Sequence, residues 1–98
     1  MLASQHNAWI HASATIAVVL VGFYFGFTRD EWSFIIVAIV AVWVAEAMNT
    51  SLELLADVTS PEFHPLVEKA KDVAAGAVLI SSIGAAIIGL IVIIPYLF

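Results

Sequence analysis

The sequence predicts an all-α membrane protein with three transmembrane helices per protomer. Of the 98 residues, 63% are hydrophobic and 11% are charged, whereas soluble globular chains carry about 25% charged residues. The mean hydropathy is +1.09. The apolar residues form three long runs that two polar stretches separate, and a helix needs roughly 20 such residues to cross a bilayer. A water-soluble fold is therefore excluded.

The three spans are expected within a single domain, residues 1–98. The first apolar run, residues 12–27, ends before a charged turn at residues 29–31. The second run begins at Trp32, and its helical pattern continues for about 26 residues, or roughly 39 Å, which exceeds the hydrocarbon thickness. Two prolines then break the chain, and Pro95 is expected to end the third helix. The predicted spans are about 10–27, 32–57 and 66–94.

The chain is too short to bury a substrate alone, so oligomerisation is expected. The third span carries small residues three or four apart, a pattern that lets helices pack closely in lipid. Alternatively, this pattern reflects only the general abundance of alanine and glycine in membrane helices. The residues are Ala70, Ala74, Ala77, Ser81, Gly84 and Ala85.

The charge balance excludes several classes of function. Three Lys and Arg residues against eight Asp and Glu residues give a net charge of −5, so nucleic acid is not an expected partner. With no cysteine, the chain has no disulfide, thiolate nucleophile or cysteine-based zinc site. Lys69 and Lys71 lie on one side of the membrane and Arg29 on the other, so the positive-inside rule favours a cytoplasmic loop between the last two spans.

An acidic stripe follows the second predicted helix. Glu46, Asn49, Glu53 and Asp57 are spaced by three or four residues, so they fall within roughly 80° of one helix face. Ionisable groups in a spanning helix are costly and normally face a bundle interior or a cavity. Carboxylates with an amide beside them suit a hard cation such as Mg²⁺.

The third helix supplies the complementary positive charge. Lys71 shares a face with Glu68 and Asp72, and an antiparallel hairpin would bring it near Glu53 and Asp57 at the membrane boundary. A divalent cation and a lysine together can bind polyphosphate. The alternative is a solvated acidic helix end with ordinary ion pairs. The three histidines, His6, His11 and His64, have no ligand spacing and are interpreted as interfacial.

These motifs resemble those of the prokaryotic diacylglycerol kinase and undecaprenol kinase family. The resemblance rests on EAMNTSLELLAD, from Glu46 to Asp57, followed by AKD, which ends at Asp72. It covers about residues 5–98. It implies a homotrimeric helical bundle that transfers the γ-phosphoryl group of ATP to the primary hydroxyl of a membrane lipid. Active sites would be shared between subunits at the cytoplasmic face of the bacterial inner membrane.

The resemblance also implies roles for individual residues. Glu46 would be the catalytic base, with Asn49 supporting it, and both would contact the lipid substrate. Glu53 would bind Mg²⁺. The residues near the nucleotide would be Lys71, Asp72, Asp57, Glu62 and His64.

The amino terminus departs from the family pattern. The family carries a motif of the type E-x-N-x-x-x-H before the first span, and here QHNAWIH retains Asn7 and His11 but has Gln5 in place of the glutamate. Gln5 is therefore the expected second metal ligand, with weaker affinity because it is uncharged. Most of the family's amino-terminal surface helix is expected to be missing.

The sequence thus predicts a Mg²⁺- and ATP-dependent lipid kinase. Two alternatives stay open at this stage. One is a catalytically weakened or silent homologue that acts as a structural subunit. The other is a small ion- or proton-translocating oligomer that uses Glu46 and Glu53 as a relay.

Overall fold

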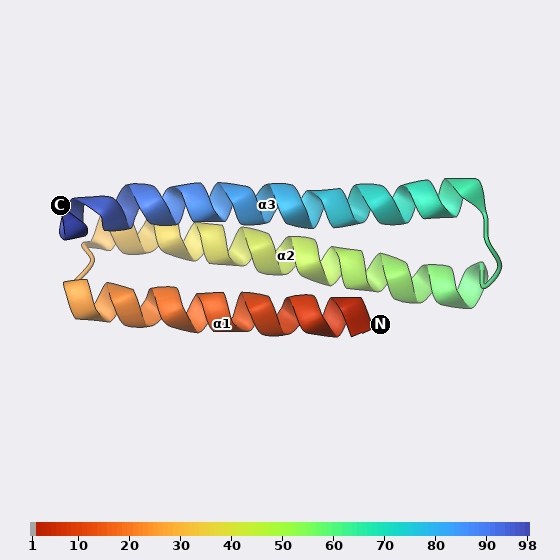
Figure 1. The fold of residues 1–98 in the computed structure, drawn as a ribbon, viewed down its shortest axis with the longest axis horizontal. Coiled ribbons are helices and arrows are strands. Elements are labelled where there is room, and N and C mark those ends of the chain that lie inside the picture. The colour runs from red at the N-terminus through yellow and green to blue at the C-terminus, as the bar shows by residue number, and fades with distance from the viewer. Residues whose placement is uncertain (1) are drawn as a thin grey trace.

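The computed structural model describes the backbone of residues 2–98 and the side chains of residues 7–98. This part of the chain forms three α-helices and no strand: α1 is Leu2–Phe25, α2 is Arg29–Thr59 and α3 is Pro65–Leu97. The helices lie antiparallel to their chain neighbours in a bundle, and in Figure 1 α2 is seen between α1 and α3. Each is long and apolar enough to cross a membrane. The predicted all-α membrane class with three spanning helices is confirmed.

The second helix begins earlier than the sequence pattern indicated. Residues 29–31 were expected to form a turn, but they are the first turn of α2. Thr28 is the reason, because its hydroxyl accepts a bond from the Glu31 N–H while the Glu31 carboxylate accepts one from the Thr28 N–H. This capping box satisfies two amides that a helix start leaves free. The charged residues therefore stabilise the helix start.

Gly26 makes the actual reversal between α1 and α2. Its φ is +71°, a left-handed conformation that glycine adopts without steric cost. Its N–H and that of Phe27 both donate to the Gly22 carbonyl, at 2.9 and 3.0 Å, which closes α1 as a typical carboxyl-terminal cap. Phe27 is buried in the core, so the turn also anchors the two helices.

The third helix differs from expectation at its far end. Pro95 lies inside α3, which continues to Leu97, although proline was expected to end it. A proline so close to the terminus removes one main-chain donor, and the last turn is closed by the Phe98 N–H, which donates to the Ile94 carbonyl. At the start, the His64 imidazole accepts from the Leu66 N–H and Pro65 occupies the first turn, where its missing N–H costs little.

The core is a narrow seam along α2. Its buried residues recur every three or four positions, which is the spacing of one helix face. Val78 and Val92 are the buried residues of α3. Most other large apolar side chains are exposed, so they face lipid or other copies of the chain. The buried residues of α2 are Ile35, Ala38, Val42, Glu46, Asn49 and Ala56.

The α2–α3 hairpin is longer than a bilayer is thick. With 31 residues, α2 measures roughly 46 Å, whereas the hydrocarbon core is about 30 Å. The amino-terminal end of α1 stops well short of the α2–α3 loop (Figure 1). The hairpin is therefore long enough to extend past the hydrocarbon, and its end with residues 53–72 carries most of the charged residues of the chain.

Candidate functional site

Two polar side chains of α2 are buried in the core, near the amino-terminal part of α1. Glu46 and Asn49 are each 3% exposed, and they are the buried polar residues of the part of the chain that the structure describes. Both lie on the α2 face that also carries Glu53 and Asp57. The predicted stripe therefore begins inside the bundle and runs outward along one helix face.

Glu46 has a neighbour at each carboxylate oxygen. The Thr50 hydroxyl donates to Oε1 at 3.5 Å. The imidazole Nε2 of His11, from α1, lies 3.5 Å from Oε2. Both Oε2 and His11 Nε2 are buried and make no hydrogen bond to any side chain or main-chain group that the structure describes. The carboxylate is thus enclosed by α1 and α2 with one oxygen unsatisfied.

Asn49 connects the buried end of the stripe to its exposed end. Its Nδ2 donates to the Glu53 carboxylate at 3.2 Å, while its own Oδ1 is buried and has no partner among residues 7–98. Glu53 is half-buried and Asp57, one turn further on, is exposed. Carboxyl and amide oxygens therefore lead from the bundle interior to its surface.

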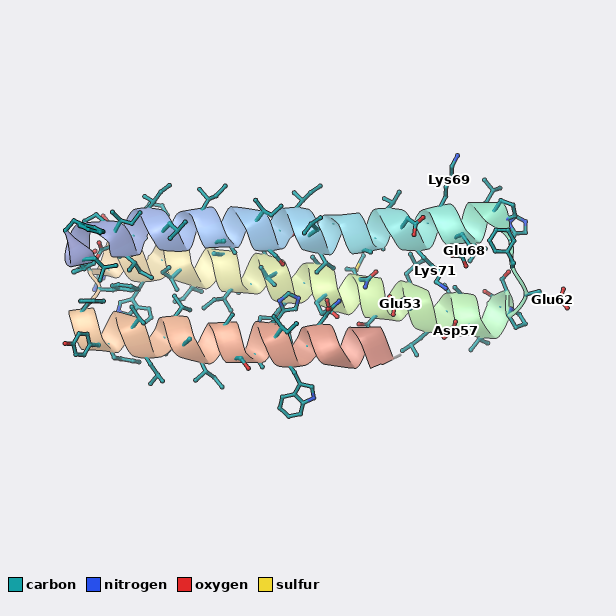
Figure 2. All side chains as sticks on the ribbon, in the orientation of Figure 1. Glu53, Asp57, Glu62, Glu68, Lys69 and Lys71 are labelled. Atoms are coloured by element: carbon teal, nitrogen blue, oxygen red, sulfur yellow. The ribbon has the colours of Figure 1, made fainter. Side chains whose placement is uncertain are left out.

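Lys71 reaches this face from the other helix. It projects from α3 toward the part of α2 that carries Glu53 and Asp57, whereas Lys69 points away (Figure 2). Its stem lines a small groove of about 220 Å³ between the two helices. Its ammonium forms an ion pair with Glu68, one turn earlier, at 3.7 Å. The hairpin thus places the lysine at the same end of the bundle as the acidic stripe.

The remaining predicted residues lie further out. Glu62, His64 and Asp72 are exposed, and Glu62 lies in the loop between α2 and α3 (Figure 2). The imidazole of His64 caps α3 through the Leu66 N–H. The side chain of Gln5, the expected second metal ligand, lies outside the described residues.

The donor set suits a magnesium ion that is shared with phosphates. Among the described residues, no three His, Cys, Asp or Glu side chains gather closely enough to hold a metal. Mg²⁺ is commonly bound by one or two carboxylates, its waters and substrate phosphates. Glu53, beside the unpartnered amide oxygen of Asn49, fits that role.

His11 is the site residue that the residue pattern did not predict. It was interpreted as interfacial because no second histidine lies at ligand spacing. Its proximity to Glu46 depends on how α1 packs against α2, which the Trp43 indole fixes by donating to the Thr15 hydroxyl at 3.1 Å. The sequence did contain one indication of this role, because His11 is the last residue of QHNAWIH, the motif that precedes the first span.

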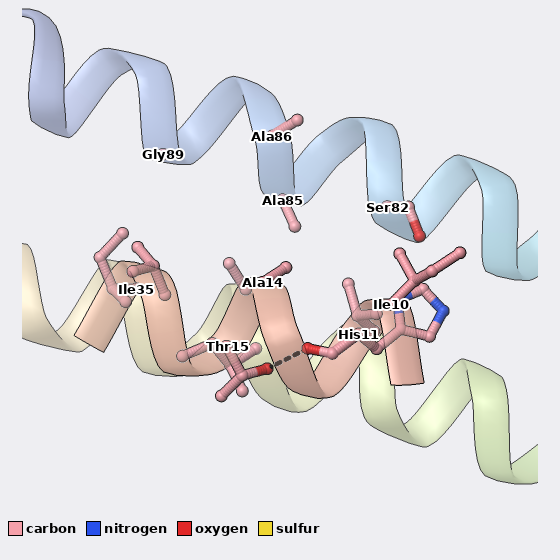
Figure 3. A pocket seen from close by; sticks show the side chains of 13 residues that line it. Ile10, His11, Ala14, Thr15, Ile35, Ser82, Ala85, Ala86 and Gly89 are labelled. Atoms are coloured by element: carbon pink, nitrogen blue, oxygen red, sulfur yellow. Dashed lines mark hydrogen bonds between the residues drawn. The ribbon is translucent and has the colours of Figure 1, made fainter. Parts of the chain in front are cut away.

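An apolar cavity of about 420 Å³ lies next to His11, the neighbour of Glu46. It lies between α1, α2 and α3, and small side chains of α3 form one wall. His11 and Ser82 line the same end of it from different helices (Figure 3), and the Ser82 hydroxyl is buried with no partner among the described residues. The wall of α3 consists of Ser82, Ala85, Ala86 and Gly89.

Fold and site together define an integral membrane protein with a buried carboxylate next to the charged end of its helical bundle. Its family follows from similarity to known proteins. The model of the prokaryotic diacylglycerol kinase family matches residues 1–93. The chain belongs to this family and is therefore a lipid kinase.

Three relatives show the range of similarity. The undecaprenol kinase of Bacillus subtilis is 36% identical over 94 residues, which cover 96% of this chain and 76% of that protein. The diacylglycerol kinase of Helicobacter pylori strain 26695 is 37% identical over 83 residues, 78% of this chain and 65% of the relative. That of Synechocystis is 33% identical over 94 residues, 95% of this chain and 54% of the relative. No solved structure matches the chain significantly.

Proposed function

We propose that this chain transfers the γ-phosphoryl group of ATP to the primary hydroxyl of a membrane lipid in a Mg²⁺-dependent reaction. The observation that carries the proposal is Glu46, a carboxylate 3% exposed at the end of the bundle from which the charged hairpin projects. A lipid and a nucleotide approach such a site from different sides. The lipid arrives from the bilayer, and the nucleotide arrives from water.

The depth of Glu46 suits a lipid hydroxyl. Trp32 marks one interface, because tryptophan is enriched at membrane surfaces. Glu46 lies roughly 21 Å further along α2, inside a hydrocarbon layer of about 30 Å but toward its opposite boundary. Lipid hydroxyls are found near that boundary.

Glu46 is proposed as the general base, and Asn49 as its polar neighbour at the lipid hydroxyl. The carboxylate accepts the hydroxyl proton while the lipid oxygen bonds to the γ-phosphorus and the bond to the leaving ADP oxygen breaks. The unpartnered Oε2 of Glu46 and Oδ1 of Asn49 provide acceptors for that hydroxyl. Both groups are held in place by the buried seam of α2.

The outer part of the site is proposed to bind the nucleotide. Lys71 would contact the phosphates as a point charge, and Glu53 would hold Mg²⁺, with Gln5 as a second ligand. A bound Mg²⁺ neutralises charge that develops on the transferred phosphoryl group. The exposed residues that would line the nucleotide approach are Asp57, Glu62, His64 and Asp72.

The proposed setting is the bacterial inner membrane, with the active site on the cytoplasmic face and three copies per assembly. The two lysines near the α2–α3 loop support this orientation under the positive-inside rule. The exposed apolar surface of the bundle supports assembly with other copies. Undecaprenol and diacylglycerol are both candidate substrates, since the names of the relatives include both and each lipid carries one primary hydroxyl on an oily body.

The test is a substrate panel. Purified wild-type protein in lipid bilayers is given labelled ATP with either diacylglycerol or undecaprenol, and Mg²⁺ is titrated. We expect transfer to one of the lipids that requires Mg²⁺. Absence of transfer to any lipid would favour a silent homologue, and proton flux across liposomes without nucleotide would favour a translocating oligomer.

Glu46→Gln tests the proposed base directly. Glutamine keeps the size of the side chain and its capacity for hydrogen bonds, but its amide cannot accept the proton. We expect lipid phosphorylation to fall by about 10³-fold, while oligomeric size on gel filtration stays unchanged. Turnover close to that of the wild type would remove Glu46 from the role of base.

A further inference from the structure

We infer that His11 is a positioning residue for Glu46. The Nε2–H of His11 donates a hydrogen bond to the Glu46 carboxylate and holds that carboxylate in the orientation needed for proton transfer. The inference rests on the proposed function, because it assigns a role next to the proposed base. It concerns a histidine on α1, which is a different helix from the one that carries the acidic stripe.

The two side chains have complementary, unsatisfied atoms. His11 Nε2 and Glu46 Oε2 are 3.5 Å apart, and the side chains are 12% and 4% exposed. Each atom is buried and has no hydrogen bond within the described part of the chain. A buried polar atom without a partner loses its hydrogen bond to water and gains none in return, so a small shift that closes this contact is favoured.

The imidazole packs against the Trp43 ring, which hydrogen bonds tie to the same turn of α1. The main-chain carbonyl of His11 accepts from the Thr15 hydroxyl at 2.7 Å, and that hydroxyl accepts from the Trp43 indole. The Trp43 ring also meets the imidazole edge to face, with centroids 6.2 Å apart and planes at 69°. The α1–α2 contact therefore determines where Nε2 points.

Each oxygen of an ionised carboxylate can accept two hydrogen bonds, so a single donor at Oε2 would leave its second lone pair for the lipid hydroxyl. Thr50 is a weak neighbour of Oε1 at 3.5 Å, and Asn49 is directed to Glu53 rather than to Glu46. No other ion pair of Glu46 occurs among the described residues. Without His11, the carboxylate could rotate about its last bond, and part of its population would face away from the lipid hydroxyl.

The experiment compares three variants in bilayers with the preferred lipid. His11→Leu removes the donor, His11→Gln keeps an N–H at a similar reach, and Ser13→Leu places the same side chain at an exposed position of α1 as the control. We expect His11→Leu to lower kcat by about 10²-fold with KM for Mg-ATP within twofold, since the nucleotide contacts lie elsewhere. His11→Gln should recover most of this loss, and Ser13→Leu should retain wild-type kinetics.

Two outcomes would overturn the inference. Wild-type kcat in His11→Leu would show that Glu46 needs no donor from α1. An equal loss in His11→Leu and His11→Gln, accompanied by loss of the assembly, would show that His11 only holds the helices together. An inactive wild-type protein would instead overturn the proposed function.

A second measurement does not depend on turnover. In protein with ¹⁵N-labelled histidine, we expect the His11 ring to carry its hydrogen on Nε2, and we expect its nitrogen resonances to shift in Glu46→Gln. His64 lies at the far end of the hairpin, so its resonances are the internal control. If the hydrogen is on Nδ1, or if His11 is insensitive to Glu46→Gln, the inferred contact is wrong.

Discussion

Gly22 determines how closely α1 approaches the start of α2. A Cβ atom at this position would lie 2.5 Å from the ring of Trp32 and 2.8 Å from that of Phe27, which is closer than real Cβ contacts. Trp32 and Phe27 pack edge to face with centroids 5.4 Å apart. At the residue scale, the absence of one side chain therefore allows two aromatic rings to close the end of the bundle opposite the site.

Gly22→Val is expected to destabilise the protein, because the aromatic pair must move to make room. Overpacking of a core typically costs about 1–3 kcal/mol. Thermal unfolding in detergent measures the change. Gly76→Ala is the control, since a Cβ at that position meets nothing within 4 Å. Equal melting temperatures for Gly22→Val and the wild type would show that the Trp32 ring moves aside without a loss of stability.

At the element scale, each helix is delimited by its own local chemistry. Thr28 and Glu31 cap the start of α2, and the Tyr96 hydroxyl of α3 also donates to the Glu31 carboxylate. One glutamate therefore caps α2 and connects it to the last turn of α3. These contacts lie at the opposite end of α2 from Glu53, so the stability of this end is separate from the chemistry of the site.

Thr28→Ala should lower stability with no effect on catalysis. The loss of a threonine amino-terminal cap costs about 1 kcal/mol, and the site lies some 18 residues, or roughly 27 Å, further along α2. Denaturant unfolding and lipid phosphorylation are measured on the same preparation. Ser33→Ala is the control, because the Ser33 hydroxyl donates only within its own helix, to the Arg29 carbonyl. A large fall in kcat for Thr28→Ala would show that the two ends of α2 are coupled.

At the scale of the whole molecule, the bundle is a thin rod. Its principal dimensions are 52 × 19 × 18 Å, so three helices of this length bury few side chains completely. The outward-facing side chains are mainly apolar, and lipid or further copies must cover them. Assembly with other copies, as in the homotrimer proposed above, would cover part of this apolar surface.

If active sites are shared between copies, as the family resemblance implies, mixed assemblies should show a specific pattern of activity. Glu46→Gln and Lys71→Ala should each be inactive alone. If Glu46 of one copy works with Lys71 of another, reassembly of the two variants together should restore up to about a quarter of wild-type activity through intact sites. Mixing without prior dissociation is the control and should restore nothing. Persistent inactivity after reassembly would show that each site is built from one chain.

Much of this arrangement could be predicted from particular residues. The apolar runs specify three spanning helices because a bilayer leaves no alternative for their main-chain polar groups. The spacing of Glu46, Asn49 and Glu53 places them on one face because the helical repeat does so wherever the helix lies. Residues 29–31 were misjudged because the capping bond of Thr28, rather than hydropathy, sets where α2 begins.

The sequence by itself determined the membrane class, the hairpin that carries the charged residues, and the single acidic face, since these depend on hydropathy, periodicity and short-range geometry. Only the tertiary structure decided that Glu46 and Asn49 are buried while Asp57 is exposed, and that His11 meets Glu46 across a helix interface. These features depend on the angle and depth at which α1 packs on α2. That packing depends on contacts between residues far apart in the sequence, such as Gly22 with Trp32 and Thr15 with Trp43. Local sequence patterns do not predict such contacts.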